Sequence, residues 1–275
     1  MTVRVALAQT KVGADKRGNL EAVAERAAEA SARSARLIVF PEASMYHFGR
    51  QNDPLAPAAE TLEGPFVTRL SELAQKNRLW ILAGMFERTD DAALVYNTLV
   101  LVDDTGTLRG TYRKMHLYDA FGYRESDRMR PGDGELLSFT IDGMRFGALT
   151  CYDLRFPETA RHHAEAGADA VVIPTAWLAG PLKEMHLTTL LQARAIENTM
   201  YVGCADQCTE GYCGNSVLFD PLGVVVVSLG EAPGLVVGEM STERIAEVRA
   251  RNPSLANARR DLYARWMEGP AALRR

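Results

Sequence analysis

Three residues that could take part in acyl transfer each follow an apolar run typical of a strand: Glu42, Lys114 and Cys151. Cys151 comes after residues 144–149, and Pro157 behind it can open a helix. A cysteine at such a strand-to-helix junction lies at the carboxyl edge of a sheet, where α/β enzymes hold reactive groups. Taken singly, Cys151 could be a packing residue, Glu42 a solvated loop carboxylate and Lys114 a surface lysine.

Together, the three side chains supply a nucleophile, a proton acceptor and a cation. Glu42 could accept the thiol proton of Cys151, protonate the leaving amine and then activate water. The Lys114 ammonium and the backbone N–H of Tyr152 could stabilise a tetrahedral oxyanion, while the amides of the turn after Cys151 are expected to favour its thiolate. These residues predict amide hydrolysis through a thioester. A Cys151–His116 dyad is the alternative arrangement.

The elements that position these groups alternate between covered strands and amphipathic helices. Helices are expected over residues 19–35, 65–77, 157–166 and 182–198, with a further helix that Ser241 caps and that runs toward Arg249. Strands are expected over residues 3–9, 37–40, 80–86, 93–102, 108–112, 136–141, 144–149, 170–173, 200–205, 216–219, 224–228 and 235–240.

Two turn signals, at residues 103–106 and at Asp142-Gly143, predict hairpins, and hairpins pair antiparallel strands. The sheets are therefore expected to be mixed. No linker or repeat divides the chain, so residues 1–275 are predicted to form a single α/β domain, a four-layer αββα sandwich with two mixed β-sheets.

Two segments stand apart from this pattern. Residues 115–135 form a polar and aromatic loop that is too long for a simple connector, so we expect it to be functional. Residues 252–275 are rich in arginine and carry Leu262, Tyr263 and Trp266 among the charges. We expect this C-terminal arm to pack on a partner subunit; a frayed terminus is the alternative.

Composition limits the classes of function. The 275 residues carry a formal net charge of −4 and are 47% hydrophobic, as in ordinary soluble globular proteins, so neither a nucleic-acid partner nor a membrane is expected. No secretion signal is visible, and four cysteines do not make a disulfide framework, which favours a cytoplasmic location. Cys204, Cys208 and Cys213 lack the paired spacing of zinc ligands, so no metal is expected.

Three segments resemble the nitrilase (carbon–nitrogen hydrolase) superfamily in their order and spacing: Pro41-Glu42, Arg113-Lys114-Met115-His116-Leu117 and Cys151-Tyr152-Asp153-Leu154-Arg155-Phe156-Pro157-Glu158. The resemblance extends from Val3 to about Leu262. It implies a Cys-Glu-Lys amidase of αββα fold that needs no metal or other cofactor and pairs as a homodimer through an eight-layer sandwich. The family's second glutamate, which hydrogen-bonds the lysine and the substrate, maps onto Glu125.

The residues after the cysteine indicate a branch of that superfamily. Nitrile-cleaving members usually carry Trp-Glu there, whereas Tyr152-Asp153 is similar to the amidase branches. Two further segments are similar to bacterial deaminated-glutathione amidases, relatives of ω-amidase: Pro174-Thr175-Ala176-Trp177 and Gly180-Pro181-Leu182-Lys183-Glu184-Met185-His186. The resemblance implies a small-molecule substrate, either deaminated glutathione or a 2-oxo acid ω-amide, cleaved with release of ammonia.

Four residues are expected to bind that substrate. Tyr152 and Trp177 would line the pocket, and Lys183 or Arg124 would hold a substrate carboxylate, because an anionic ligand in an apolar pocket needs a cation. A solvated surface cation is the alternative for Lys183 and for Arg124. Two other functions remain open: an N-carbamoyl amine amidohydrolase with the same triad, and a catalytically silent binding or scaffold protein.

Overall fold

Strand β1 (Thr2–Gln9) is covered on both faces, and this determines the layered architecture. Val3, Val5 and Leu7 belong to one hydrophobic core, while Ala6 and Ala8 belong to a second core on the opposite face. Successive side chains of a strand point to opposite faces, so an apolar strand of this kind needs a layer on each side. The computed structural model describes residues 1–267, and residues 268–275 of the predicted arm lie outside the described part.

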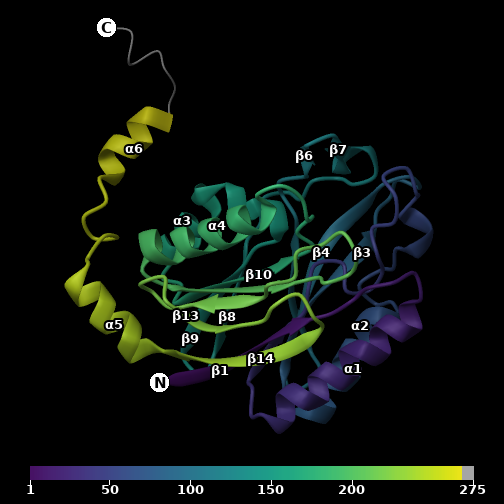
Figure 1. Cartoon of the computed structure of the whole chain (residues 1–275), viewed down its shortest axis with the longest axis horizontal. Coiled ribbons are helices and arrows are strands. Elements are labelled where there is room, and N and C mark those ends of the chain that lie inside the picture. The colour runs from purple at the N-terminus through teal and green to yellow at the C-terminus, as the bar shows by residue number, and fades with distance from the viewer. Residues whose placement is uncertain (268–275) are drawn as a thin grey trace, which may run out of the picture.

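Two six-stranded sheets form the centre of the fold (Figure 1). In spatial order, the first sheet contains β14 (Gly234–Ser241), β1, β2 (Leu37–Val39), β3 (Trp80–Arg88), β4 (Val95–Val102) and β5 (Leu108–Arg113). The second contains β13 (Val225–Ser228), β12 (Val217–Phe219), β11 (Tyr201–Asp206), β10 (Ala170–Thr175), β9 (Met144–Ala148) and β8 (Leu137–Ile141). In each sheet three central strands are parallel and the outer pairings are antiparallel. The predicted mixed sheets are confirmed.

Helices cover the outer faces of both sheets. Helices α1 (Lys16–Ala32) and α2 (Pro65–Asn77) lie on the first sheet, and α3 (Pro157–Glu165) and α4 (Lys183–Asn198) lie on the second (Figure 1). The inner faces pack on each other, with Leu7 and Leu82 of one sheet and Phe146 and Val172 of the other in a single core. The predicted αββα sandwich is thereby confirmed.

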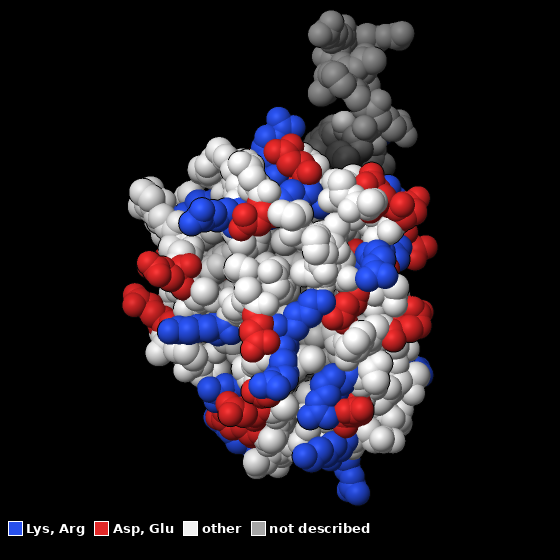
Figure 2. All heavy atoms as spheres, turned by 90° about the vertical axis from the view of Figure 1, so that its right-hand side faces the viewer, with Lys and Arg blue, Asp and Glu red and all other residues white. Residues whose placement is uncertain are grey.

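The chain leaves this body through two C-terminal helices, α5 (Thr242–Arg251) and α6 (Arg260–Met267). The Ser241 side chain caps α5 by accepting hydrogen bonds from the N–H groups of Glu243 and Arg244, as predicted. Figure 1 shows α6 standing mostly clear of the sheets. Within residues 1–267, no helix is both long and apolar enough to cross a membrane. On the face that Figure 2 shows, Lys and Arg side chains are interspersed with Asp and Glu side chains.

Two predicted helix starts are wrong for local reasons, and one predicted loop contains short elements. Helix α1 begins at Lys16 rather than at residue 19, because the Asp15 carboxylate caps it by accepting from the Arg17 N–H. Helix α4 begins at Lys183 rather than at residue 182, because Leu182 has a left-handed backbone with φ 61°. The segment 115–135 contains a small hairpin, β6 (Asp119–Ala120) and β7 (Tyr123–Arg124), followed by a 3-10 turn over Glu125–Asp127.

Candidate active site

The turn after β2 carries Glu42 into the interior, where the residue is 1% exposed. Ala43 follows it with a left-handed φ of 54°, and the backbone at this turn passes close to Gly84 of β3. A Cβ atom at Gly84 would lie 3.0 Å from both the Cα and the carbonyl carbon of Glu42, and nearer still to the Ala43 nitrogen. Only glycine leaves room for this turn, which fixes the direction of the Glu42 side chain.

Both oxygens of the Glu42 carboxylate are held by buried donors. Oε1 accepts from Asn97 Nδ2 at 2.7 Å and from Lys114 Nζ at 3.0 Å, and Oε2 accepts from the Ala176 N–H at 2.8 Å. Ala176 follows β10 of the second sheet, whereas the other donors belong to the first sheet. The carboxylate is therefore fixed by groups from both sheets.

Lys114, directly after β5, bridges two carboxylates. Its Nζ lies 3.0 Å from Glu42 Oε1 and 2.9 Å from Glu125 Oε2, and Glu125 Oε2 also accepts from the Tyr118 N–H at 2.7 Å. Burial alone would favour the neutral amine, but the negative charges of Glu125 and Glu42 outweigh it and raise the pKa of Lys114 well above its usual range. Burial raises the pKa of Glu125; Lys114 opposes this shift and Glu42 adds to it. The cluster therefore keeps a permanent ammonium.

Cys151 lies at the end of β9, at the first position of a 3-10 turn over Cys151–Arg155. Its φ is 46°, a left-handed conformation that is costly for a non-glycine residue and is characteristic of functional positions. The turn is locked by buried Asp153, whose Oδ2 accepts from the Thr150 N–H at 3.0 Å and from the Tyr112 hydroxyl at 2.6 Å. The surrounding structure thus holds the thiol in place against local backbone preference.

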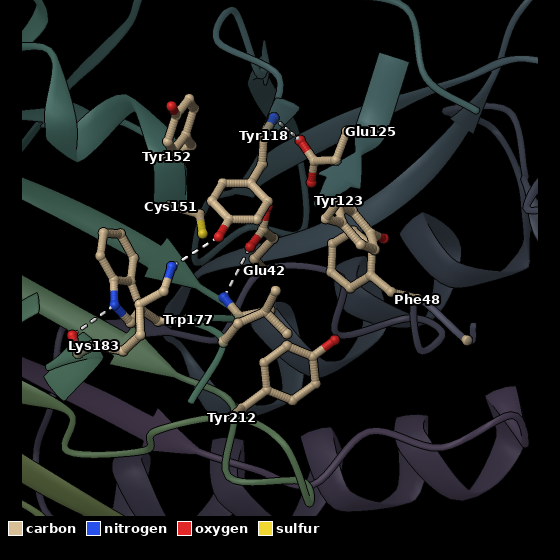
Figure 3. A pocket seen from close by; sticks show the side chains of 13 residues that line it. Glu42, Phe48, Tyr118, Tyr123, Glu125, Cys151, Tyr152, Trp177, Lys183 and Tyr212 are labelled. Carbon is tan, nitrogen blue, oxygen red and sulfur yellow. Dashed lines mark hydrogen bonds between the residues drawn. The ribbon is translucent and has the colours of Figure 1, made fainter. Parts of the chain in front are cut away.

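The surroundings of Cys151 disfavour its thiolate. Burial raises the pKa of Cys151 well above its ordinary value and the negative charge of Glu42 adds to this shift, whereas Lys114 and the Ala176 N–H oppose it. The predicted effect of the following amides, to favour a thiolate or a developing oxyanion, stays a prediction. A base must remove the proton during the reaction, and Figure 3 shows Glu42 beside the sulfur.

His116 is engaged elsewhere. Its Nδ1 lies 2.7 Å from Asp153 Oδ1, its backbone N–H donates to the same oxygen, and its ring stacks on Phe156 with centroids 3.7 Å apart. These contacts hold the imidazole in the wall of the turn, where it supports Asp153. The geometry favours Glu42 over His116 as the base for Cys151.

A cavity of about 80 Å³ opens above Cys151 and Glu42. Of the four predicted substrate-binding residues, Tyr152, Trp177 and Lys183 line it, and Glu125 is also in its wall (Figure 3). Arg124 is not among the lining residues: its side chain is 65% exposed and pairs with Asp127 at 3.4 Å. The remaining lining residues are mainly apolar or aromatic: Phe48, Gly49, Tyr118, Tyr123, Ala176, Leu178 and Tyr212.

Lys183 brings an uncompensated positive charge to the cavity. Its Nζ donates to the Tyr118 hydroxyl at 2.8 Å, and no carboxylate lies within 4.0 Å of it among residues 1–267. Burial and the nearby Arg155 cation lower the pKa of Lys183, while Cys151 opposes the shift. An anionic ligand group beside this ammonium would relieve both effects.

Sequence reasoning missed Arg155 and Asn97. The Arg155 guanidinium lies 5.0 Å from the ring centroid of Trp177 and 5.9 Å from that of Tyr152, and its buried Nε and Nη2 have no hydrogen-bond partner within the described chain. Arg155 belongs to the cysteine motif quoted above, so the sequence shows where it stands in the chain. The sequence does not show that its guanidinium lacks a hydrogen-bond partner. Asn97 lies in β4 beside another polar residue, Thr98, and no pattern in the sequence singles it out; only the fold brings it to Glu42.

The clustered groups are those of acyl transfer. Within residues 1–267, no three His, Cys, Asp or Glu side chains come together in an arrangement that could hold a metal ion. A thiol, a carboxylate that can take its proton and a fixed ammonium can together form and break a tetrahedral adduct of an amide.

Comparisons with known proteins agree with this chemistry. A family model described as carbon-nitrogen hydrolase matches residues 4–250. The chain is 39% identical over 242 residues to deaminated glutathione amidase of Escherichia coli O157:H7, covering 88% of this chain and 91% of that relative. It is 30% identical over 279 residues to Omega-amidase NIT2 of Homo sapiens, covering 97% and 99%. A solved mutant of the Nesterenkonia AN1 amidase from the nitrilase superfamily superposes with a TM-score of 0.82 at 27% identity, covering 96% and 97%.

Proposed function

Because the chain belongs to the carbon–nitrogen hydrolase family, we propose that it hydrolyses a small linear amide that carries a carboxylate, through a thioester on Cys151. The preferred acyl group is that of a 2-oxo acid, as in a 2-oxo acid ω-amide or deaminated glutathione. The observation that carries this proposal is the Lys183 ammonium in the wall of the cavity that holds the nucleophile, with the Arg155 guanidinium near the rings of Tyr152 and Trp177 in the same wall. Neither has a carboxylate within 4.0 Å in the described part of the chain, so a substrate carboxylate would complete the site.

The proposed reaction begins with proton transfer. Glu42 takes the proton of the Cys151 thiol as the sulfur attacks the amide carbon, and the Lys114 ammonium with the Tyr152 N–H stabilises the resulting oxyanion. The adduct collapses as the C–N bond breaks, and Glu42 returns the proton to the leaving nitrogen, so ammonia departs from a primary amide. Glu125 acts by holding Lys114 through its 2.9 Å ion pair.

Hydrolysis of the thioester completes the cycle. Glu42 removes a proton from water as the water oxygen attacks the thioester carbon, and the second collapse breaks the C–S bond. The sulfur regains a proton from Glu42 and the carboxylic acid leaves. One buried carboxylate thus serves all proton transfers, which requires that it stay fixed beside the sulfur; its three hydrogen bonds provide that constraint.

The two other functions are less favoured. The relatives described above are named as amidases and not as carbamoyl-amine hydrolases. A silent scaffold would not need a nucleophile with a left-handed backbone in the same cavity as Lys183, a cation that has no carboxylate partner in the described chain. Both alternatives therefore leave part of the observed geometry without a purpose.

A nitrogen-release assay tests the proposal. We expect ammonia from 2-oxo acid ω-amides, with a lower rate from neutral amides of similar size and no release from N-carbamoyl amines. Glu42→Gln preserves the shape of the side chain but removes the base, so turnover should fall by about 10²–10⁴-fold. His116→Asn serves as the control and should retain most of the turnover per folded molecule. Full turnover in Glu42→Gln together with its loss in His116→Asn would refute the carboxylate mechanism.

We further propose a cytoplasmic homodimer. All four cysteines are free thiols, as is usual in reducing compartments. The described part of the predicted arm leaves Tyr263 45% and Trp266 57% exposed, and aromatic side chains of this kind are enriched in protein–protein interfaces. Residues 252–267 therefore offer a surface for the partner subunit, in line with the eight-layer pairing that the family resemblance implies.

A further inference from the structure

A further buried acid, Asp206, lies near Glu42 and takes no part in the reaction described above. It is the last residue of β11, it pairs with Thr175 at the end of β10, and it is 0% exposed. Burial raises the pKa of Asp206 well above its usual range, and the negative charge of Glu42 adds to this shift. A carboxyl group buried this deeply is costly unless its oxygens are hydrogen-bonded, so its partners indicate what it does in the fold.

One oxygen of Asp206 holds the backbone on both sides of Ala176. Oδ1 accepts from the Thr175 hydroxyl at 2.7 Å and from the Trp177 N–H at 2.8 Å. Ala176, the residue between these two donors, donates its own N–H to Glu42 Oε2 at 2.8 Å. The direction of the Ala176 N–H is therefore set by a segment whose two flanking residues are both bound to Asp206.

The surroundings of Asp206 suit a neutral carboxylic acid. No Lys, Arg or His nitrogen lies within 4.0 Å of its oxygens among residues 1–267, and Lys114 already pairs with Glu42 and Glu125. An ionised Asp206 would thus add a buried negative charge without a counter-ion. Oδ1 accepts both hydrogen bonds, whereas buried Oδ2 has no partner within the described chain, so Oδ2 is the oxygen that is free to carry the proton.

Trp177 has other contacts that hold it in the cavity wall. Its indole Nε1 donates to the Lys183 carbonyl at 2.9 Å, and its backbone carbonyl accepts from the Cys213 N–H at 2.9 Å. Figure 3 shows the indole ring next to Lys183. Loss of the Asp206 contact should therefore disturb the bond from Ala176 to Glu42 more than the ring that would meet the substrate.

We propose that Asp206 is a positioning residue, which directs the Ala176 N–H toward Glu42 and so keeps this base aligned with the Cys151 sulfur. This inference rests on the proposed function, through the role of Glu42 as the base, and adds a residue to it. Asp206 does not line the cavity, and it neither takes nor gives a proton in the cycle. It fixes the direction of one of the three hydrogen bonds that hold the Glu42 carboxylate.

Two substitutions of Asp206 test this role. Asp206→Asn keeps an acceptor at the place of Oδ1 and puts an amide nitrogen where Oδ2 has no donor, so kcat should stay close to the natural value. Asp206→Ala removes both hydrogen bonds. Its kcat for amide hydrolysis, per folded molecule, should fall by about 10–100-fold, the size of a lost hydrogen bond to a charged group, while KM changes little.

Val202→Ala is the matched control for loss of buried volume. Val202 is 0% exposed in β11 and points to the same face as Asp206, but lies four residues away, about 13 Å along the strand. The substitution should reduce stability and leave kcat per folded molecule as in the natural chain. Circular dichroism and urea unfolding give the folded fraction of each variant.

Alkylation of Cys151 by iodoacetamide tests the alignment of the base without cleavage of an amide. The sulfur bonds to the methylene carbon, iodide leaves, and the thiol proton passes to Glu42, so the rate depends on where the base lies. Peptide mapping by mass spectrometry assigns the product to Cys151. We expect alkylation to be slower in Asp206→Ala and to recover in Asp206→Asn.

The inference is overturned if Asp206→Ala keeps both the natural kcat per folded molecule and the natural alkylation rate; the proposed function then still stands. It is also overturned if Asp206→Asn loses as much activity as Asp206→Ala, or if Val202→Ala loses as much per folded molecule. If the natural chain cleaves no amide, the proposed function fails. The alkylation rates then decide on their own whether Asp206 aligns Glu42 with the sulfur.

Discussion

Gly84→Ala tests whether the backbone contact beneath Glu42 positions the catalytic carboxylate. The added methyl carbon would lie 3.0 Å from two backbone atoms of Glu42 and closer to the Ala43 nitrogen, all of them backbone atoms that cannot rotate away. Ordinary contact requires about 3.4 Å or more, so the turn must retreat by several tenths of an ångström or more. A shift approaching 1 Å at a catalytic group can cost about 10²-fold in rate, and overpacking typically costs about 1–3 kcal/mol of stability.

We therefore expect kcat/KM to fall by about 10²-fold in Gly84→Ala while the protein still folds. The measurement is amide hydrolysis per folded molecule, with the folded fraction taken from circular dichroism and urea unfolding. Gly203→Ala is the matched control in a central strand of the other sheet: its methyl carbon would meet only side-chain atoms, the nearest 3.4 Å away on Leu7. This control should keep activity close to that of the natural chain. The reasoning would be refuted if kcat/KM of Gly84→Ala equalled that of the natural chain, or if unfolded protein fully accounted for the loss of activity.

Two further predictions concern charge. Lys183→Met should raise KM for an anionic amide by about 10–100-fold, because it removes a charge-assisted contact. The same substitution should change KM little for a neutral amide of similar size. Equal effects on both substrates in steady-state assays would contradict the proposed contact between Lys183 and a substrate carboxylate. Burial lowers the pKa of His163 from 6.5 to about 4, so the unfolded chain binds more protons than the folded one between these values. The free energy of unfolding should reach its full value above about pH 6.5 and should fall by up to about 3 kcal/mol as the pH drops toward 4. Urea unfolding at pH 7, 6 and 5 measures this loss, and His163→Gln should reduce it; an unreduced loss would show that other groups cause it.

The sequence allowed prediction of those features that depend on local pattern. Apolar runs located the central strands, and Asp142-Gly143 turns between β8 and β9 with φ values of 48° and 83°, as a tight hairpin requires. The strand ends carrying Glu42 and Cys151 followed from the same reasoning. The positions of these two residues in the chain thus carried the main hypothesis about chemistry.

What could not be predicted depends on contacts between distant segments. The raised pKa of the Cys151 thiol depends on how deeply it is buried and on the charge of Glu42, neither of which has a signal in the sequence. Arg155 and Arg124 are both arginines near predicted functional segments, yet one lies over cavity-lining rings and the other pairs with Asp127 in solvent. Only the folded chain distinguishes a cation without a partner from one that already has one.

The Glu42 carboxylate accepts hydrogen bonds from Asn97 and Lys114 on the side of one sheet and from Ala176 on the side of the other. Catalytic activity therefore depends on the relative position of the two sheets. A small slide of one layer over its neighbour would separate base from nucleophile while leaving most strands and helices intact. Inactivation by heat or denaturant should consequently precede the loss of secondary structure.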